Sequence, residues 1–150
     1  MITRPTTRRR FLAALGALGL GVLANPAWVR AAAKGVIKKP VPASGELLPV
    51  IGLGSSRTFD VSPNTRESAA LVPVMQAFFD QGGALIDTSP MYGQAEAVLG
   101  ELLRTVRHDR KQLFAATKVW TWGRQEGIDQ MQQSMRRMGV KRFDLIQIHN

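Results

Sequence analysis

Short apolar runs alternate along the chain with longer segments in which apolar residues recur every three or four positions. The runs have the length of buried strands, and the periodic segments have the length of amphipathic helices. The expected strands are 47–53, 84–87, 113–119 and 143–149, and the expected helices are 72–80, 96–106 and 128–138. Ala and Leu in 84–87 also suit a buried helix. Strands that alternate with helices predict right-handed βαβ units and a parallel sheet.

Proline and glycine mark the boundaries of these elements. Pro73 has no N–H to donate, so we expect the regular helix to begin near Val72. Gly82 follows the end of that helix, and Gly139 is expected to cap the helix 128–138. The Pro-rich segment 34–45 is expected to be an extended connector to a domain that covers 46–150.

Three polar residues stand at or near the carboxyl ends of successive expected strands. Asp87, Lys118 and His149 follow one another at equal intervals along the chain. The interval matches one strand, one helix and two loops, which together take about 30 residues. Each βαβ unit is therefore expected to deliver one polar group to the same edge of the sheet.

The number of units predicts an α/β fold of the barrel class. In a (β/α)8 TIM barrel the active site lies at the carboxyl ends of the strands, and eight units take about 250 residues. The 150-residue chain supplies about the first four units. An open four-stranded sheet would expose apolar edges. We therefore expect either the first half of a longer protein or a half-barrel that is completed by an assembly.

The segment 1–33 has the pattern of an export signal. Arg8 and Arg9 precede an apolar stretch, 11–24, and a small-residue site, 31–33. The pair of arginines resembles a twin-arginine signal, which implies the twin-arginine export machinery as a partner, a periplasmic location and Lys34 as the first mature residue. The stretch is shorter than the about 20 residues of a membrane span. An amphipathic or disordered tail and an uncleaved anchor are the alternatives.

Charge and composition exclude several classes of protein. The chain has a formal net charge of +9, but five arginines and no acidic residue lie in the segment 1–33. The body is thus mildly basic, and the basic residues at 136–142 have no interleaved aromatic residues, which argues against a nucleic-acid partner. The chain has no cysteine, which excludes disulfides, thiolate zinc sites and iron–sulfur clusters. No metal site is expected.

Four residues together suit carbonyl reduction. Tyr92, the only tyrosine in the chain, follows Asp87 by five positions. A phenol donates a proton poorly at neutral pH unless a cation stabilises its charged form, and an ammonium such as that of Lys118 can do this. A carboxylate keeps the ammonium charged and oriented, and a neutral imidazole such as that of His149 can hydrogen-bond a carbonyl oxygen as it gains charge. This combination describes reduction by hydride transfer.

The segment 83–96 resembles the signature of aldo/keto reductases, in which Asp87, Thr88, Tyr92, Gly93 and Glu96 match. The segments 48–54, 116–119 and 144–150 look like the first, third and fourth barrel strands of that family. The resemblance spans residues 46 to 150.

The resemblance implies roles for individual residues. Tyr92 would be the general acid, Lys118 and Asp87 its tuning pair, and His149 the group that orients the carbonyl. NADPH is the cofactor that it implies, with NADH in some members, and the substrate would be a small aldehyde or ketone. The residues that it assigns to the cofactor site are Gly54, Ser55, Asp87, Lys118 and Asn150. The family's main pyrophosphate and adenine-ribose contacts lie on later strands.

Other interpretations stay open for the protein and for each residue. A nicotinamide-binding subunit without catalysis and an inactive half-barrel are the alternative functions. Taken singly, Asp87 suits a helix cap, Lys118 a solvated strand end, His149 a structural histidine and Tyr92 a packing residue. Glu96 suits the amino end of a helix, where a negative charge complements the dipole.

Overall fold

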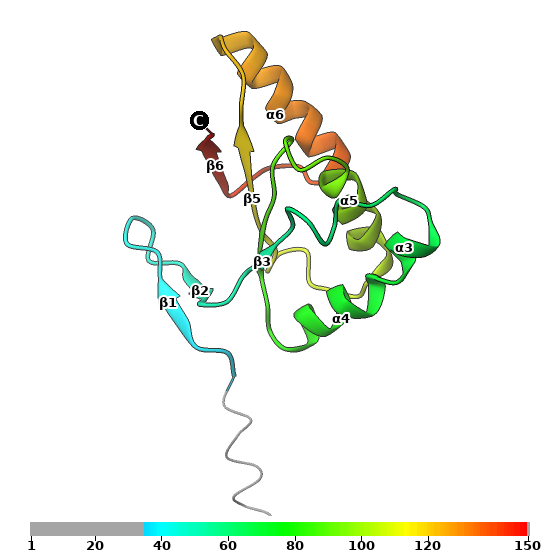
Figure 1. Cartoon of the computed structure of the whole chain (residues 1–150). Helices are drawn as coiled ribbons and strands as arrows, with labels where there is room; N and C mark the ends of the chain where they lie inside the picture. Colours follow the sequence, from blue (N-terminus) through cyan, green and yellow to red (C-terminus); the bar gives the residue numbers. More distant parts are fainter. Residues whose placement is uncertain (1–34, 150) are drawn as a thin grey trace, which may run out of the picture. The chain divides into compact units, whose positions relative to one another are not determined.

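The computed structural model describes residues 35–149 (Figure 1). The predicted export signal at 1–33, Lys34 and Asn150 lie outside the described residues, so the signal stays a prediction. None of the helices among residues 35–149 is long and apolar enough to cross a membrane.

Four parallel strands form the main sheet. They are β3 (Leu53–Gly54), β4 (Leu85–Asp87), β5 (Phe114–Val119) and β6 (Leu145–Ile148), and they are hydrogen-bonded in the order β3-β4-β5-β6. Each strand thus lies beside the next one in the chain, with no reversal of order. A doubly wound sheet would reverse its order, whereas a barrel does not. The predicted βαβ units and parallel sheet are confirmed.

Three helices lie close to their predicted positions, namely α4 (Val72–Asp80), α5 (Ala95–Thr105) and α6 (Arg124–Met138). The short helix α3 (Arg66–Ala69), which precedes them, is not among the predicted helices. Helix α4 begins at Val72 with Pro73 in its first turn, as expected, and Gly139 ends α6 with a left-handed φ of 68°. Helix α6 begins four residues before the expected start at 128. Its first turn is polar and exposed, so it carries no apolar periodicity to detect.

The expectation of one buried strand over 47–53 is wrong. This run is divided between β2 (Leu47–Pro49), which pairs antiparallel with β1 (Lys38–Pro40), and the short strand β3. The expected connector therefore contains a strand of a hairpin. Pro49 has no N–H with which to extend a ladder, and Val50 and Ile51 after it are 44% and 67% exposed. An apolar run alone does not show which strand is its partner.

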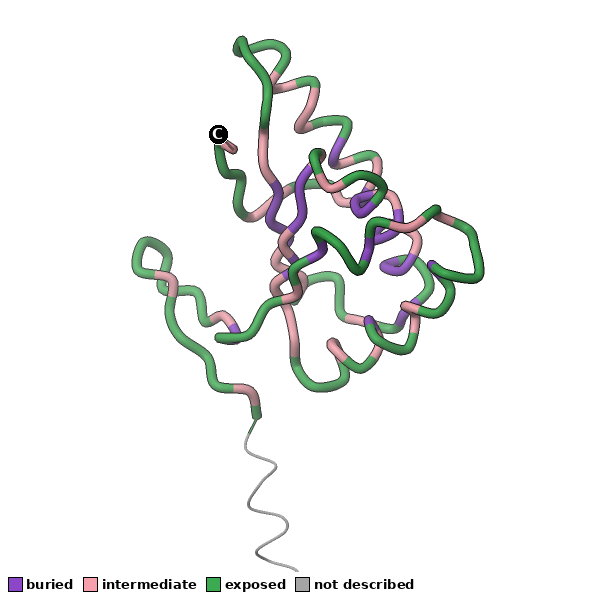
Figure 2. Tube along the Cα trace, viewed as in Figure 1, coloured by how far each residue is buried: buried purple, intermediate pink, exposed green. Residues whose placement is uncertain are grey.

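The strand β6 lies where the sequence predicts it, but the expectation that it is buried is wrong. All four of its residues are exposed, and Ile148 is 88% exposed. Among the described residues β6 pairs with β5 along one edge only. No described strand lies along its other edge, so its apolar side chains have no neighbours on that side and stay exposed, as Figure 2 shows.

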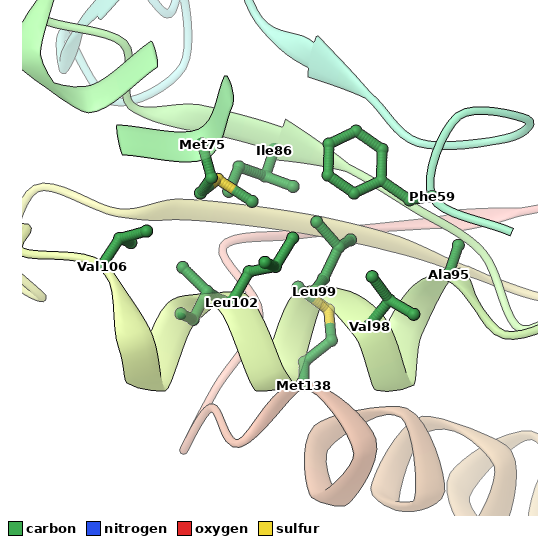
Figure 3. Close-up of a cluster of buried hydrophobic side chains, with 10 residues drawn as sticks. Phe59, Met75, Ile86, Ala95, Val98, Leu99, Leu102, Val106 and Met138 are labelled. Atoms are coloured by element: carbon green, nitrogen blue, oxygen red, sulfur yellow. The ribbon is translucent and has the colours of Figure 1, made fainter. Parts of the chain in front are cut away.

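The hydrophobic core lies between the sheet and the helices (Figure 3). Met75 of α4, Ile86 of β4 and Leu99 and Leu102 of α5 are fully buried there. Met138 at the end of α6 joins the same cluster. Helix α5 is thus the central helix of the described fold, because its buried side chains share a cluster with Ile86 of the sheet and it packs against both neighbouring helices.

A glycine permits the close approach of α5 and α6. A side-chain carbon at Gly100 would collide with the main-chain carbonyl oxygen of Arg137. Backbone atoms yield less readily than the end of a flexible side chain, so any larger residue at position 100 would push the two helices apart. This contact sets the distance between α5 and α6.

We therefore predict opposite effects for two Gly→Ala substitutions in helices. Gly100→Ala should lower the free energy of unfolding by about 1–3 kcal/mol, because overpacking outweighs the better helix propensity of alanine. Gly127→Ala in α6, where no atom lies within 4 Å of the added carbon, should raise the free energy by about 0.5–1 kcal/mol. Urea unfolding measures both values, and stabilisation by Gly100→Ala would contradict the close contact.

Candidate active site

The sequence-predicted residues converge on the carboxyl edge of the sheet. Asp87 ends β4, and it pairs in register with Gly54 on one side and Ala116 on the other. Lys118 lies two residues beyond Ala116 on β5 and is in register with Gln147 of β6. The equal spacing along the chain therefore delivers polar groups to one edge, as expected.

The ammonium of Lys118 is held by three oxygen atoms. Its Nζ donates to both carboxylate oxygens of Asp87, each at 2.8 Å, and to the main-chain oxygen of Thr88 at 3.0 Å. An ammonium has three donors, so all of them are engaged. The side chain of Lys118 is 12% exposed and that of Asp87 is 36% exposed. The positive charge is therefore fixed in position and largely shielded from water.

The tyrosine lies beside this ammonium. The Nζ of Lys118 is 5.2 Å from the centroid of the Tyr92 ring, within the range of a cation–π contact. The backbone of Tyr92 is held on both sides, because its N–H donates to the carbonyl oxygen of Ser89 and its own carbonyl oxygen accepts from Ala95 N–H. Tyr92 also packs against the hydrophobic core. The loop thus presents the ring to the charged pair in a defined orientation.

An aspartate far away in the sequence holds the loop after the tyrosine. Gly93 has a left-handed φ of 53°, and a side-chain carbon there would collide with the carboxylate of Asp60. The Oδ1 of Asp60 accepts a hydrogen bond from Gln94 N–H at 2.9 Å. Sequence reasoning missed Asp60, because 34 positions separate it from Gln94 and no motif connects them.

Two of the predicted cofactor residues lie on the neighbouring strand end. Ser55 is 1% exposed, and its Oγ donates to the main-chain oxygen of Asp87 at 3.0 Å. Among residues 35–149, no atom lies within 4 Å of the position that a side chain would occupy at Gly54. The edge is therefore anchored at Ser55 and open at Gly54. Asn150, the fifth predicted cofactor residue, lies outside the described residues.

His149 follows β6 at the same edge. Its N–H donates to the carbonyl oxygen of Val119 at 2.9 Å, which continues the ladder between β5 and β6. The side chain is partly buried. The backbone thus brings His149 to the strand next to Lys118, whereas its action on a carbonyl stays a prediction.

A buried carboxylate connects the tyrosine loop to the lysine strand. Glu96, in the first turn of α5, is 1% exposed. Its Oε1 accepts from Thr117 Oγ1 at 3.0 Å, and its Oε2 pairs with Arg137 Nη1 at 3.4 Å. Burial of a charge is costly unless it is paired and hydrogen-bonded. Glu96 therefore acts as more than a charge at the helix end, the role that its sequence position alone suggests.

The partners of Glu96 carry no signal in the sequence. Thr117 directly precedes Lys118, and Arg137 lies 41 positions after Glu96. The glutamate belongs to the family signature, but a signature within one segment does not indicate contacts with other segments.

The side-chain oxygen of Thr88 is also buried, and among residues 35–149 it has no hydrogen-bond partner.

A comparison with models of protein families identifies the family of this chain. The model of the aldo/keto reductase family matches residues 50–150. The chain belongs to this family.

Individual members of the family are similar to this chain in sequence. The chain is 32% identical over 117 residues to methylglyoxal reductase YeaE of Escherichia coli, a match that covers 75% of this chain and 39% of the relative. It is 35% identical over 104 residues to an aldo-keto reductase of Mycolicibacterium vanbaalenii, covering 68% and 34%. The chain thus spans less than half of the length of these relatives.

Solved structures confirm the fold. An aldo-keto reductase from Klebsiella pneumoniae, determined in complex with NADPH, superposes with a TM-score of 0.63 at 27% identity, and the match covers 76% of this chain and 40% of that one. The fold is that of a (β/α)8 barrel, of which this chain supplies about the first four βα units.

The Glu96 cluster leads to a prediction about stability. Thr117→Val keeps the shape of the side chain but leaves Glu96 Oε1 without its donor, which should lower the free energy of unfolding by about 1–3 kcal/mol. Thr117→Ser keeps the hydroxyl and should lose clearly less. Urea unfolding compares the two variants. A larger loss in Thr117→Ser than in Thr117→Val would show that the methyl group of Thr117, rather than the hydrogen bond, stabilises the fold.

Proposed function

We propose that the protein is an NAD(P)H-dependent oxidoreductase that reduces a small aldehyde or ketone to an alcohol. The observation that carries the proposal is the ammonium of Lys118, which is held by Asp87 and lies beside the ring of Tyr92. Membership of the aldo/keto reductase family supports it. The relative named methylglyoxal reductase is consistent with a small carbonyl substrate.

Each of the four residues has a separate task in this reaction. The hydroxyl of Tyr92 gives its proton to the carbonyl oxygen of the substrate, and the Lys118 ammonium stabilises the phenolate that remains. Asp87 keeps the ammonium charged and directed toward the ring. His149 donates a hydrogen bond to the same carbonyl oxygen while negative charge develops on it.

The open strand end suits a nicotinamide cofactor. Gly54 has no side chain and no neighbouring atom within 4 Å of its side-chain position, so a flat ring has room to approach the backbone. Gly54, Ser55 and Asp87 would hold this end of the cofactor, together with Lys118 and Asn150. When bound, the cofactor supplies the hydride that reduces the carbonyl carbon. NADPH is the proposed form, in keeping with the Klebsiella relative that was solved with it.

The proposed acid can be tested by removal of one hydroxyl group. In the native protein, Tyr92→Phe should lower kcat/KM for carbonyl reduction by at least about 100-fold, because general acid catalysis typically contributes that much or more. Binding of NADPH, measured by quenching of protein fluorescence, should change less than twofold. Thr105→Val, which removes an exposed hydroxyl in the last turn of α5, should leave turnover unchanged.

Two outcomes would contradict this proposal. Turnover that survives in Tyr92→Phe would exclude the tyrosine as the acid. A wild-type protein that retains NADPH tightly and oxidises it only once with a range of carbonyls would be a nicotinamide-binding subunit instead of an enzyme.

We also propose that residues 1–33 direct export through the twin-arginine route and are removed before Lys34. The basic pair, the apolar stretch and the small-residue site support this. Proteins on this route travel folded, which suits an enzyme that binds its cofactor before export.

The signal can be tested in the producing cell. Arg8→Lys together with Arg9→Lys should keep the protein in the cytoplasm at its uncleaved mass, while Arg30→Lys should be exported normally. Fractionation and intact-mass measurement give both results. Processing of the double variant before Lys34 would show that the arginine pair is not the recognised element.

A further inference from the structure

A cavity lies at the opposite end of the sheet from the candidate active site. It has a volume of about 440 Å³ and lies between the carboxyl-terminal ends of α5 and α6 and the loops that lead into β5 and β6. This volume is within the range of small-molecule pockets, about 300–1,000 Å³. We call it the lower cavity.

The alternation of side chains along β5 places the lower cavity on the helix-covered face of the sheet. Ala115 and Thr117 lie two residues apart on β5 and so share a face. Thr117 bonds Glu96 of α5, so this face points toward the helices. Ala115, which is 2% exposed, lines the cavity. The cavity is therefore separate from the inner face of the barrel and from the open edge of β6.

The inner wall of the lower cavity is apolar. Leu103 of α5 and Met138 of α6 are 6% and 1% exposed. The partly buried Leu113 and Val140 complete this wall from the two loops. Such a surface favours a hydrocarbon group over water.

The rim of the lower cavity is strongly basic. Five basic side chains line it, namely Arg104, Arg110, Lys111, Lys141 and Arg142. The one carboxylate in the lining, Asp144, accepts from Ala115 N–H at 2.9 Å and pairs with Arg142 at 3.0 Å. Within residues 35–149 the other four basic side chains form no ion pair.

The charge of the described chain is concentrated at this end. The segments 104–111 and 136–144 hold eight basic and two acidic residues, whereas the rest of 35–149 holds six basic and nine acidic residues. Helix dipoles explain part of this concentration, because Arg104 lies in the last turn of α5 and Arg136 and Arg137 lie in the last turn of α6. They do not explain the basic residues at 110–111 and 141–142, which line the cavity beyond those turns, where the effect has fallen off.

We propose that the lower cavity binds a small amphiphilic anion. A carboxylate or phosphate group would lie among the basic side chains, and a short hydrocarbon body would cover the partly buried Leu113 and Val140. Converging like charges repel one another, and a bound anion removes that repulsion. The apolar wall selects against a bare inorganic ion. This site is independent of the proposed reductase activity.

The proposal is tested with decanoate as the probe. Isothermal titration of the full chain with decanoate, kept below its micelle concentration at low ionic strength, should give one site. Acetate lacks the hydrocarbon body and decanol lacks the charge, so each should bind at least tenfold more weakly. Higher salt should weaken the binding of decanoate, because the rim is open to solvent.

A pair of matched variants separates the cavity from general charge. Lys111→Gln with Lys141→Gln should weaken decanoate binding about tenfold. Both side chains are exposed, so the fold should be retained, which circular dichroism checks. Lys38→Gln with Lys39→Gln makes the same change in net charge on β1, outside the cavity lining, and should alter the affinity less than twofold.

Three results would overturn the proposal. Equal losses in the two double variants would show adsorption by net charge. Acetate that binds as tightly as decanoate would show that the apolar wall plays no part. Binding to vesicles that contain anionic lipid, without binding of free decanoate, would identify a membrane-surface contact instead of a small-molecule site.

Discussion

The contact of Lys118 with Asp87 is the interaction on which the candidate active site depends. It joins two neighbouring parallel strands, and it forms because Asp87 is in register with Ala116, two residues before the lysine. A shift of register by one residue would turn the lysine to the helix-covered face. The buried core around Ile86 and α5 fixes that register. The chemistry at the edge thus rests on apolar packing beneath it.

A second constraint, the contact between α5 and α6, acts at both ends of the sheet. Gly100 lets the backbone of α6 approach, which brings Arg137 within reach of Glu96. Glu96 in turn holds Thr117, the residue before Lys118, so the helix contact reaches the strand that carries Lys118. Toward their carboxyl-terminal ends the same two helices form walls of the lower cavity. One close packing distance therefore shapes two separate surfaces.

The sequence predicts the parts of the fold that depend on local pattern. Helical periodicity locates α4, α5 and α6, and the spacing of Asp87, Lys118 and His149 predicts their common edge. The prediction of one strand over 47–53 fails because the apolar residues of this run are divided between a hairpin and a barrel strand. The prediction that β6 is buried fails because the hydrophobic pattern does not reveal what covers a strand. Contacts such as that of Asp60 with Gln94 join segments 34 positions apart, so no local sequence pattern predicts them.

The excess of basic residues in the described chain lies far from the candidate active site. Lys118 donates all three of its hydrogen bonds to Asp87 and Thr88, so it is not available as a general anion site. The excess of basic residues lies at the far end of the sheet, around the lower cavity. A high isoelectric point therefore says little about the reaction here. In the proposed reaction the decisive charge is the paired ammonium of Lys118, because a fixed charge a few ångströms from the reacting group outweighs a larger charge that lies far away and is screened by solvent.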